Sequence, residues 1–391
     1  MVTVEEAIKL IDQHTIHGPV ENKKLDEALN YILFADVCSP IDMPPFRQSA
    51  MDGYALNFTA EVKSYHVIGE IAAGSSELFN LKPGEAVRIF TGAAVPDSAN
   101  VVVQQEIVER VENNISLMKE IQMGQNIRPR GEQISSNEVA LKKGTVLNPA
   151  ALGFLTTLGL TDVLVHRKPA VAILTTGSEL VKPGTPLKHG QIYESNSVML
   201  MGALMNYGFD KPTMVKVNDD LQSTTLSIQN LLAQHDFILI SGGISVGDYD
   251  YVKEALTQQG VQEIFYKVKQ KPGKPVFFGR KENKIVFALP GNPASALTCF
   301  YVYALPALQK FSGISEPGLQ RVKLKLNKSY SKKPGLAHFL KSTIYGDEVT
   351  ISDSQSSAML NSFAQADAMI YLPADQENFA ENSVVDVLLI R

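Results

Sequence analysis

The sequence has few cysteines and no excess of basic residues. Only Cys38 and Cys299 occur in 391 residues, which excludes a disulfide scaffold and a zinc or iron–sulfur site built from several cysteines. Such sparse use of cysteine fits a reducing compartment. The formal net charge is −5, which argues against a non-specific nucleic-acid binder, because such proteins need a basic surface.

Long apolar runs and several well-known motifs are also missing. No stretch approaches the roughly 20 apolar residues of a membrane-spanning helix. Glu5 and Glu6 lie where a signal peptide would carry basic residues, so we expect a cytoplasmic protein without membrane association. The sequence has no H-E-x-x-H, G-x-S-x-G, Walker A or G-x-G-x-x-G motif, which weakens zinc-protease, α/β-hydrolase, ATPase and Rossmann-dehydrogenase interpretations.

What is present is typical of a globular chain whose length predicts two to four domains. Near the N-terminus, Thr3 and Glu6 form a capping box before helical apolar spacing, and the stretch 25–37 predicts a second helix. From about 46 to 135 short β-type runs alternate with turns, including a hairpin across 112–114. Helical signals return at Asn148, an expected N-cap followed by Pro149. We therefore predict a helical domain, 1–45 with 136–168, that carries an inserted β domain, 46–135.

The stretch 169–312 carries a different pattern. Continuous apolar runs end in glycine-rich turns and alternate with helical segments, which predicts βαβ units and a mostly parallel sheet. After about 313 the pattern becomes all-β again, and a turn is expected at 345–347. The predicted fold class is therefore multidomain α/β plus all-β.

Three loops of unusual composition follow the predicted parallel strands, at 175–179, 241–250 and 290–293. Ligands of open parallel sheets bind beyond the carboxyl ends of the strands. Each loop leads towards a helix, whose first N–H groups attract anions. A single loop of this kind is usually an ordinary turn, but three in one domain favour a phosphate or nucleotide site.

Charged residues gather near these loops. Between Lys267 and Lys284 seven cationic residues accompany only Glu282, a local charge of 7 − 1 = +6. Most such runs are solvated surfaces, but prolines and a glycine stiffen the turn 271–275, which suits a multiply charged anion. A second basic turn lies at 126–132.

Isolated carboxylates also occur at turns, namely Asp52, Glu179, Asp219 with Asp220, and Asp248 with Asp250. Each alone is more typical of a cap or turn residue. Beside anion-binding loops they fit a Mg²⁺ site, because Mg²⁺ takes one or two carboxylates plus phosphate oxygens. Both cysteines lie in apolar segments and are expected to be packing residues.

Eight ordered motifs give the chain a resemblance to a known family. They are PPFRQSAMDGYA (44–55), RIFTGAAVP (88–96), NIRPRGE (126–132), ILTTGSEL (173–180), GQIYESNS (190–197), SGGISVGDYDYVKE (241–254), KPGKP (271–275) and LPGNPASAL (289–297). In this combination the chain resembles the molybdopterin molybdenumtransferases, the bacterial MoeA proteins related to the E domain of gephyrin. The resemblance implies an elongated homodimer with four domains per subunit. The central domain, 169–312, would be molybdopterin-binding and similar to the MogA-type adenylyltransferase, and 313–391 would be a small β-barrel.

The resemblance also implies a reaction. Adenylylated molybdopterin and molybdate would give molybdenum cofactor and AMP, with Mg²⁺ as cofactor and an upstream molybdopterin adenylyltransferase as a possible partner. The expected catalytic residues are Asp52, Thr91, Glu179, Asp219 and Asp250, of which Glu179, Asp219 and Asp250 would hold Mg²⁺ or contact the pterin. The expected substrate-binding residues are Arg128, Gly177, Ser241, Gly242, Gly243, Ser245, Gly247, Lys267, Lys271, Lys274, Pro290, Asn292 and Ser357. We expect Asp52 and Thr91 to reach the site from the partner subunit.

Two positions depart from the family pattern. Gln133 lies where the family commonly has Asp, and an amide cannot replace a carboxylate as metal ligand or base. Lys341 lies where Arg is common, which keeps the charge but loses the bidentate fork.

Three alternatives stay open. A molybdopterin adenylyltransferase using Mg-ATP shares two of the loops, but it would leave the motifs at 44–55 and 88–96 without a role. A non-enzymatic scaffold that anchors partner peptides would use the same fold. Insertion of tungstate rather than molybdate cannot be distinguished from the sequence, because the two oxyanions have nearly equal size and charge.

Overall fold

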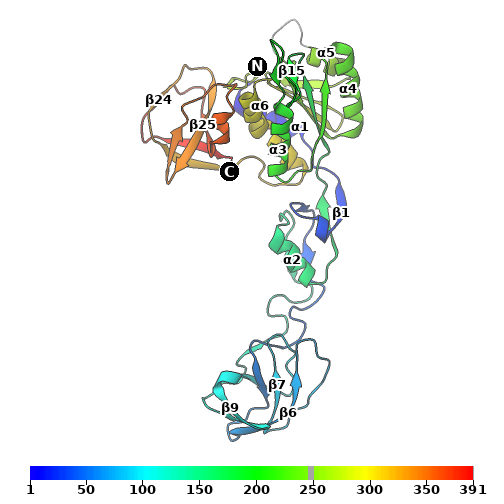
Figure 1. Ribbon diagram of the computed structural model, residues 1–391, viewed down its shortest axis with the longest axis vertical. Coiled ribbons are helices and arrows are strands. Elements are labelled where there is room, and N and C mark those ends of the chain that lie inside the picture. Colours follow the sequence, from blue (N-terminus) through cyan, green and yellow to red (C-terminus); the bar gives the residue numbers. More distant parts are fainter. Residues whose placement is uncertain (245–250, 391) are drawn as a thin grey trace. The chain divides into compact units, whose positions relative to one another are not determined.

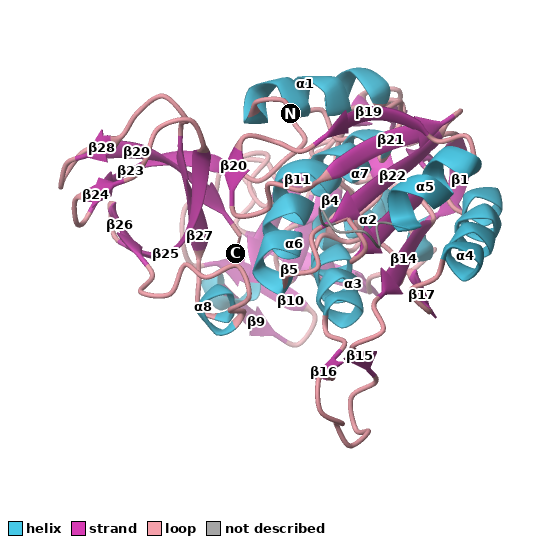
Figure 2. Cartoon of the chain, turned by 90° about the horizontal axis from the view of Figure 1, so that it is seen from above, coloured by secondary structure: helices cyan, strands magenta, loops and turns pink. Residues whose placement is uncertain are grey.

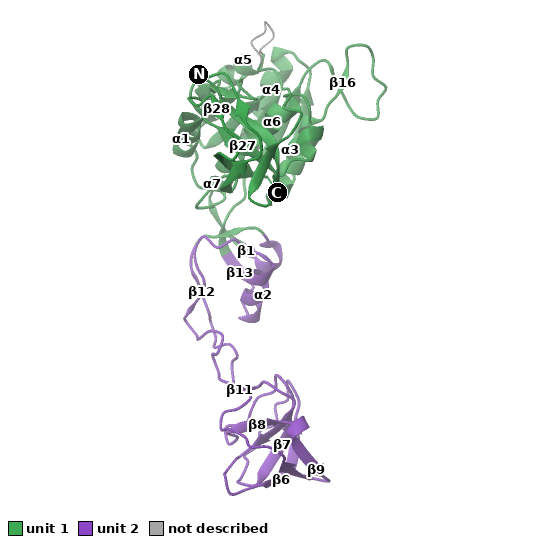
Figure 3. Cartoon of the chain, turned by 90° about the vertical axis from the view of Figure 1, so that its left-hand side faces the viewer, with its two compact units in different colours: residues 1–22, 30–34, 164–391 green, residues 23–29, 35–163 purple. Residues whose placement is uncertain are grey.

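The computed structural model describes residues 1–244 and 251–390. The chain divides into two compact units (Figure 1, Figure 3). Unit 1 comprises residues 1–22, 30–34 and 164–391, and unit 2 comprises residues 23–29 and 35–163. The predicted site residues Ser245, Gly247 and Asp250 lie outside the described residues.

Several helices begin where the sequence predicts them. Thr3 accepts a hydrogen bond from the Glu6 N–H while Glu6 reaches back to the Thr3 N–H, which completes the capping box of α1. Asn148 caps α2 by accepting from the Ala151 N–H at 2.8 Å. The described helices are α1 (Val4–His14), α2 (Pro149–Thr157), α3 (Asn196–Asn206), α4 (Leu221–Gln234), α5 (Tyr251–Gln258), α6 (Pro293–Cys299), α7 (Leu305–Phe311) and α8 (Asn361–Ala364), with a π-helical turn at Phe300–Ala304 between α6 and α7.

The central sheet of unit 1 has the strand order β17-β14-β18-β22-β21-β19. The strands are β14 (Val171–Thr176), β17 (Thr213–Val217), β18 (Phe237–Ser241), β19 (Gln262–Tyr266), β21 (Phe277–Lys281) and β22 (Lys284–Leu289). The first four in this order are parallel, which confirms the predicted mostly parallel sheet. The last two pair antiparallel at one edge, a feature that the pattern did not indicate.

Helices cover both faces of this sheet (Figure 2). Along β14, Val171 and Ile173 face one core with α1, α3 and α7, while Ala172 and Leu174 face the other with α4 and α5. Successive side chains of a strand point to opposite faces. A strand that is apolar at every position is therefore buried on both faces of the sheet. The helices on the two faces explain the continuous apolar runs of 169–312.

The C-terminal part of unit 1 is a closed small β-barrel, as predicted. Its strands follow the order β25-β26-β23-β29-β27, and β27 pairs back to β25. They are β23 (Arg321–Leu326), β25 (Ala337–Tyr345), β26 (Glu348–Ile351), β27 (Ala368–Leu372) and β29 (Val384–Leu389). The expected turn connects β25 to β26, where Gly346 has a φ of +62°. The short β20 (Gln270–Lys271) adds parallel to β25.

Unit 2 contains a six-stranded sheet of order β8-β5-β7-β6-β10-β9. These strands are β5 (Gly53–Leu56), β6 (Ser64–Ile71), β7 (Glu85–Ile89), β8 (Val101–Gln104), β9 (Val108–Val111) and β10 (Asn114–Leu117). The predicted hairpin is confirmed, since β9 pairs antiparallel with β10 and Glu112 adopts a φ of +52° in its turn.

Short strands complete the fold. They are β1 (Val20–Lys24), β2 (Ile32–Leu33), β3 (Val37–Cys38), β4 (Gln48–Ser49), β11 (Ile127–Arg128), β12 (Val139–Leu141), β13 (Asp162–His166), β15 (Leu180–Val181), β16 (Ile192–Tyr193), β24 (Tyr330–Ser331) and β28 (Asn378–Phe379).

The helix predicted over 25–37 is wrong. Only a 3₁₀ turn forms at Leu25–Glu27, and Asn30 has a left-handed φ of +63° that ends helical geometry. Ile32 and Leu33 pair with β13 instead. Tertiary pairing with a distant strand outweighs the local helical spacing, which is a weak preference by comparison.

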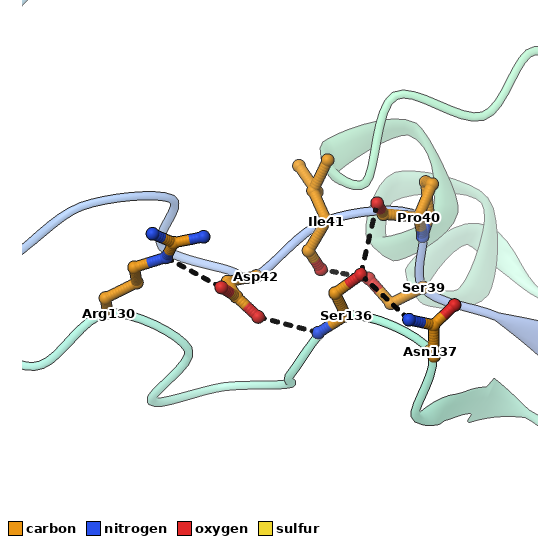
Figure 4. Close-up of polar contacts among 7 residues, drawn as sticks. All are labelled: Ser39, Pro40, Ile41, Asp42, Arg130, Ser136 and Asn137. Atoms are coloured by element: carbon orange, nitrogen blue, oxygen red, sulfur yellow. Dashed lines mark hydrogen bonds and ion pairs between the residues drawn. The ribbon is translucent and has the colours of Figure 1, made fainter.

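The two chain segments that enter and leave the β part of unit 2 are tied together at Asp42 (Figure 4). Its Oδ2 accepts from Arg130 Nε at 2.6 Å and its Oδ1 accepts from the Ser136 N–H at 2.7 Å. These contacts, the Ser136 N–H first, hold the pKa of Asp42 below its usual value. The segments also exchange backbone hydrogen bonds between Met43 and the stretch 133–134.

Candidate functional site

The three loops that the sequence singled out line one pocket of about 490 Å³ in unit 1, the second of them through its described part, 241–244. They follow β14, β18 and β22, which are neighbours and parallel, so their carboxyl ends lie at one edge of the sheet. The starts of α3 and α6 and one residue of the barrel, Ala358, complete the wall. The lining residues are Thr175, Thr176, Glu179, Leu180, Ile192, Tyr193, Glu194, Ser195, Asn196, Ser241, Gly242, Ile244, Pro275, Pro290, Gly291, Asn292, Pro293 and Ala358.

Two predicted carboxylates belong to this region. Glu179 lines the pocket. Asp219 accepts a hydrogen bond from the Thr176 hydroxyl at 3.1 Å, and Thr176 also lines the pocket. The neighbouring Asp220 instead caps α4 by accepting from the Ser223 N–H at 2.8 Å, which lowers the pKa of Asp220. Of this adjacent pair, Asp219 is the one oriented towards the pocket wall.

The glycine of the second loop is required by close packing of the backbone. Gly242 has a φ of +97°, and a Cβ added there would lie 2.4 Å from the Thr176 carbonyl oxygen. Only glycine combines that conformation with that approach. It keeps the loops after β14 and β18 in contact at the pocket edge. Gly243, also predicted, belongs to the same contact, since a Cβ added there would lie 3.1 Å from the Thr176 side chain, whereas one added at Gly177 would meet Glu179 and Leu180 of its own loop.

The third loop is joined to the barrel. Asn292 Nδ2 donates to Ser357 Oγ at 3.1 Å, and the Ala294 N–H donates to the Ser357 carbonyl at 3.0 Å. Pro290 and Asn292 line the pocket, and Ser357 contacts the Asn292 side chain. The structure thus brings the predicted Ser357 to the rim through Asn292.

Lys341 has a structural part in this arrangement. Its side chain is buried, and its Nζ donates to the carbonyls of Ser356 and Met359 at 3.2 Å and to Ser362 Oγ at 2.7 Å. Burial lowers the pKa of Lys341. The ammonium therefore stabilises the segment around Ser357. Its three hydrogen bonds use the three N–H donors of a lysine.

The predicted lysines lie beside the pocket rather than in its wall. Lys271 and Lys274 are exposed, and Pro275, next to Lys274, lines the pocket. Lys267 is half-buried, with its Nζ 4.8 Å from the ring centroid of Tyr266, whose hydroxyl donates to the Ile244 carbonyl. The stiff turn predicted from the prolines is packed against α6, because Gly273 contacts Cys299.

No group of three His, Cys, Asp or Glu suited to a metal ion occurs within residues 1–244 and 251–390. Asp250, one of the three expected ligands, is outside those ranges. The two described members, Glu179 and Asp219, offer oxygen donors of the kind that Mg²⁺ prefers.

A second set of predicted residues lies in unit 2. Asp52 Oδ1 accepts from the Thr91 N–H at 2.7 Å and from the Thr91 hydroxyl at 2.8 Å. These bonds, the backbone N–H first, and the charge of Arg88 lower the pKa of Asp52. Arg88 is itself fixed by donating to the Gly53 carbonyl at 2.8 Å. On the surface of unit 2, the exposed Asp52 carboxylate is thus held in one orientation by the exposed Thr91 and favoured in its ionised form.

Arg128 lies on the same part of unit 2. It is exposed on β11, paired with Gln48 of β4. Gln48 in turn donates to the Gly92 carbonyl at 3.1 Å, next to Thr91. Gln133, where the family commonly has Asp, is exposed, and its N–H donates to the Met43 carbonyl beside the Asp42 contacts.

Sequence reasoning missed two buried polar residues of the pocket, Glu194 and Asn196. Both carboxylate oxygens of Glu194 accept from Ser197, through its N–H at 2.9 Å and its hydroxyl at 2.5 Å. Asn196 bridges two of the loops. The motif at 190–197 contains both, but alternation of polar residues before a helix is also typical of ordinary caps, so the pattern did not single them out.

The two cysteines differ. Cys299 is a packing residue, as predicted, fully buried with the pKa of its thiol raised by burial. For Cys38 the prediction is wrong, because this side chain is exposed. It lies on the short strand β3, whose partner in the described sheets is β12.

None of the helices in the described part of the chain is long and apolar enough to cross a membrane.

Three protein-family models match successive parts of the chain. They are described as MoeA N-terminal region (domain I and II), over residues 2–159, Probable molybdopterin binding domain, over 172–310, and MoeA C-terminal region (domain IV), over 323–390. The second coincides with the sheet that carries the pocket.

Relatives of known name and structure match along the full length. Proteins named molybdopterin molybdenumtransferase from Staphylococcus epidermidis RP62A and Staphylococcus aureus Mu50 are 32% and 31% identical over 399 residues, covering 99% of this chain and 95% of each relative. The crystal structure of the molybdopterin biosynthesis MoeA protein from Pyrococcus horikoshii OT3 matches with a TM-score of 0.81 and 29% identity, covering 100% of both chains. Another structure of a Pyrococcus MoeA protein matches with a TM-score of 0.83 and 31% identity, covering 100% of this chain and 99% of the other. On the family models, the full-length relatives and the fold together, this chain belongs to the MoeA family.

Proposed function

We propose that this chain inserts molybdenum into molybdopterin during biosynthesis of the molybdenum cofactor. The relatives that match it over 99% of its length are named molybdopterin molybdenumtransferase. The observation that carries the proposal is that the described parts of all three loops line one pocket, and these loops lie within the segment matched by the molybdopterin-binding model.

The proposed substrates are adenylylated molybdopterin and molybdate, and the products are the molybdenum cofactor and AMP. The loops after β18 and β22 line the pocket with Ser241 and Gly242 and with Gly291 and Asn292. Their backbone N–H groups would suit the pyrophosphate of such a substrate. Pro275, Pro290 and Pro293 add rigid apolar wall for a planar ring system. A polar edge beside an apolar wall is the usual composition of a pocket for a small ligand.

We propose that the chain binds a magnesium ion next to the carboxylates of Glu179 and Asp219. Glu179, Asp219 and Asp250 would hold it, together with phosphate oxygens of the substrate. When bound, Mg²⁺ neutralises phosphate charge and so favours departure of AMP. The Thr176 hydroxyl orients the Asp219 carboxylate by its hydrogen bond, so this oxygen is in place before any ion binds.

Cationic side chains would hold molybdate. Lys267, Lys271 and Lys274 lie on the segment that runs past the pocket at Pro275. Asp52 and Thr91 belong to unit 2, and we propose that they complete the site from the partner subunit of a homodimer. Arg128, also in unit 2, is a further proposed substrate-binding residue. The proposed subunit has four domains with the boundaries expected from the sequence. It acts in the cytoplasm on the product of an upstream molybdopterin adenylyltransferase.

Release of AMP from adenylylated molybdopterin tests this function. The purified chain should release AMP only when molybdate and Mg²⁺ are both present, and omission of either should stop release. A control with metal-free molybdopterin and Mg-ATP should show no ATP consumption. ATP consumption would support the adenylyltransferase alternative, and absence of any turnover would favour a peptide-anchoring scaffold. Tungstate added in competition measures which oxyanion the site prefers.

A further inference from the structure

Asn196 joins the walls of the pocket. It is the first residue of α3, only 8% exposed, and lines the pocket. Its Nδ2 donates to Ser241 Oγ and to the Gly291 carbonyl oxygen, both at 2.8 Å. One side chain therefore connects the loops after β18 and β22 to the start of α3.

These contacts fix which way the amide points. The Gly291 carbonyl can only accept, so the atom that faces it has to be the Nδ2 donor. The other atom, Oδ1, is buried and has no hydrogen-bond partner among the residues that the structure describes. A buried carbonyl oxygen without a partner is unfavourable, which makes this atom a place where a ligand donor gains a hydrogen bond.

Neighbouring polar atoms do not offer the same chemistry. Both oxygens of Glu194, also in the pocket wall, already accept from Ser197. The Ser241 hydroxyl accepts from Asn196 itself. Among the buried side-chain oxygen and nitrogen atoms that line the pocket within the described residues, Asn196 Oδ1 is thus the one without a hydrogen-bond partner.

We propose that Asn196 Oδ1 accepts an N–H of the pterin ring and so recognises the heterocyclic end of the substrate. This inference rests on the proposed function of the pocket. The pyrophosphate of the substrate and molybdate present only acceptor oxygens at neutral pH and cannot donate to a carbonyl oxygen, whereas the lactam and amino groups of a pterin are N–H donors. Asn196 therefore favours binding of the pterin ring next to the start of α3. The anionic groups of the substrate would bind at the loops after β18 and β22.

Binding of pterin, followed by its fluorescence, tests the proposal on the full chain. The comparison ligand is 2-dimethylamino-3-methylpteridin-4-one, which has the ring system without N–H donors. The wild-type protein should bind pterin about tenfold more tightly than this analogue, as expected for one buried hydrogen bond. In Asn196→Ala the preference should fall to about twofold or less, while the affinity for AMP changes by less than about twofold.

The matched control is Thr224→Val. Thr224 is also buried, and its hydroxyl oxygen has no partner within the described part of the chain. It lies on α4 and does not line the pocket, so the preference for pterin should persist. Equal weakening of pterin and AMP in Asn196→Ala would show that Asn196 only positions the loops and would overturn the proposal. If Asn196→Ala does not fold, the wild-type protein is measured alone. Equal affinity of the wild-type protein for pterin and for its methylated analogue would then overturn the inference.

The outcome is separable from the proposed function. A wild-type chain that shows the pterin preference but releases no AMP contradicts the proposed reaction and keeps the role of Asn196. A chain that releases AMP without any pterin preference keeps the reaction and rejects that role.

Discussion

At the scale of single residues, Asp52 shows how local bonding prepares a charged group. Two hydrogen bonds from Thr91 and the nearby Arg88 favour its ionised form. Asp52→Ala removes the carboxylate, and we expect turnover to fall by about a hundredfold while the fold is kept, because the side chain is exposed. AMP release under saturating substrate measures this. Wild-type turnover in both Asp52→Ala and Asp250→Ala would contradict the assigned roles.

His338 should make the free energy of unfolding depend on pH. It is buried on β25, where burial, and then the charges of Lys332 and Lys271, lower its pKa to about 4 from an ordinary value near 6.5. Between those pH values the unfolded chain binds a proton that the folded chain does not. Stability therefore falls as pH drops from 6.5 to 4, by up to roughly 3 kcal/mol.

His338→Gln should remove that part of the slope when the free energy of urea unfolding is measured from pH 7 to pH 4. The matched control is His189→Gln, since His189 is exposed in the folded chain and loses little hydration on folding. An unchanged slope in His338→Gln would mean that other groups cause the acid sensitivity.

The pocket-lining residues that follow strands were easier to predict from the sequence than those at the start of α3. Glu179, Ser241 and Asn292 follow apolar runs, so their position at the sheet edge could be predicted. Asn196 could not be singled out, because its importance depends on two loops that are 45 and 95 residues away. The hydrogen bonds of the buried Lys341 ammonium could not be predicted either, since its three partners come from a neighbouring segment of the barrel.

At the scale of elements, helix ends were predictable because capping is local. Asn148 caps α2 through a 2.8 Å bond to the Ala151 N–H, so Asn148→Ala should cost about 1 kcal/mol of unfolding free energy. Asn148→Asp keeps the acceptor oxygen and should retain most of that stability. Equal loss in both variants would show that the cap bond is not the cause.

Elements that depend on distant partners were harder to predict. The stretch 25–37 has helical spacing, yet Ile32 and Leu33 form a strand because β13 pairs with them. The antiparallel edge of the central sheet also escaped prediction, since parallel and antiparallel strands have similar apolar runs when both faces are buried.

At the scale of the whole molecule, the origin of Asp52 can be tested by mixing inactive subunits. Asp52→Ala and Glu179→Ala each remove one half of the proposed site. If the halves come from different subunits, a mixed dimer carries one intact site, and equal mixing should restore about a quarter of wild-type AMP release. If both halves come from one subunit, mixing restores nothing.

The proposed reaction transfers a metal, so the number of molybdenum atoms transferred is measured together with the AMP released. The purified chain is incubated with adenylylated molybdopterin, molybdate and Mg²⁺, and the AMP released and the molybdenum bound to pterin are both quantified. We predict about one molybdenum inserted for each AMP released, with Glu179→Ala slowing both equally. AMP release without molybdenum insertion, or insertion into molybdopterin that carries no adenylyl group at the same rate, would contradict the account.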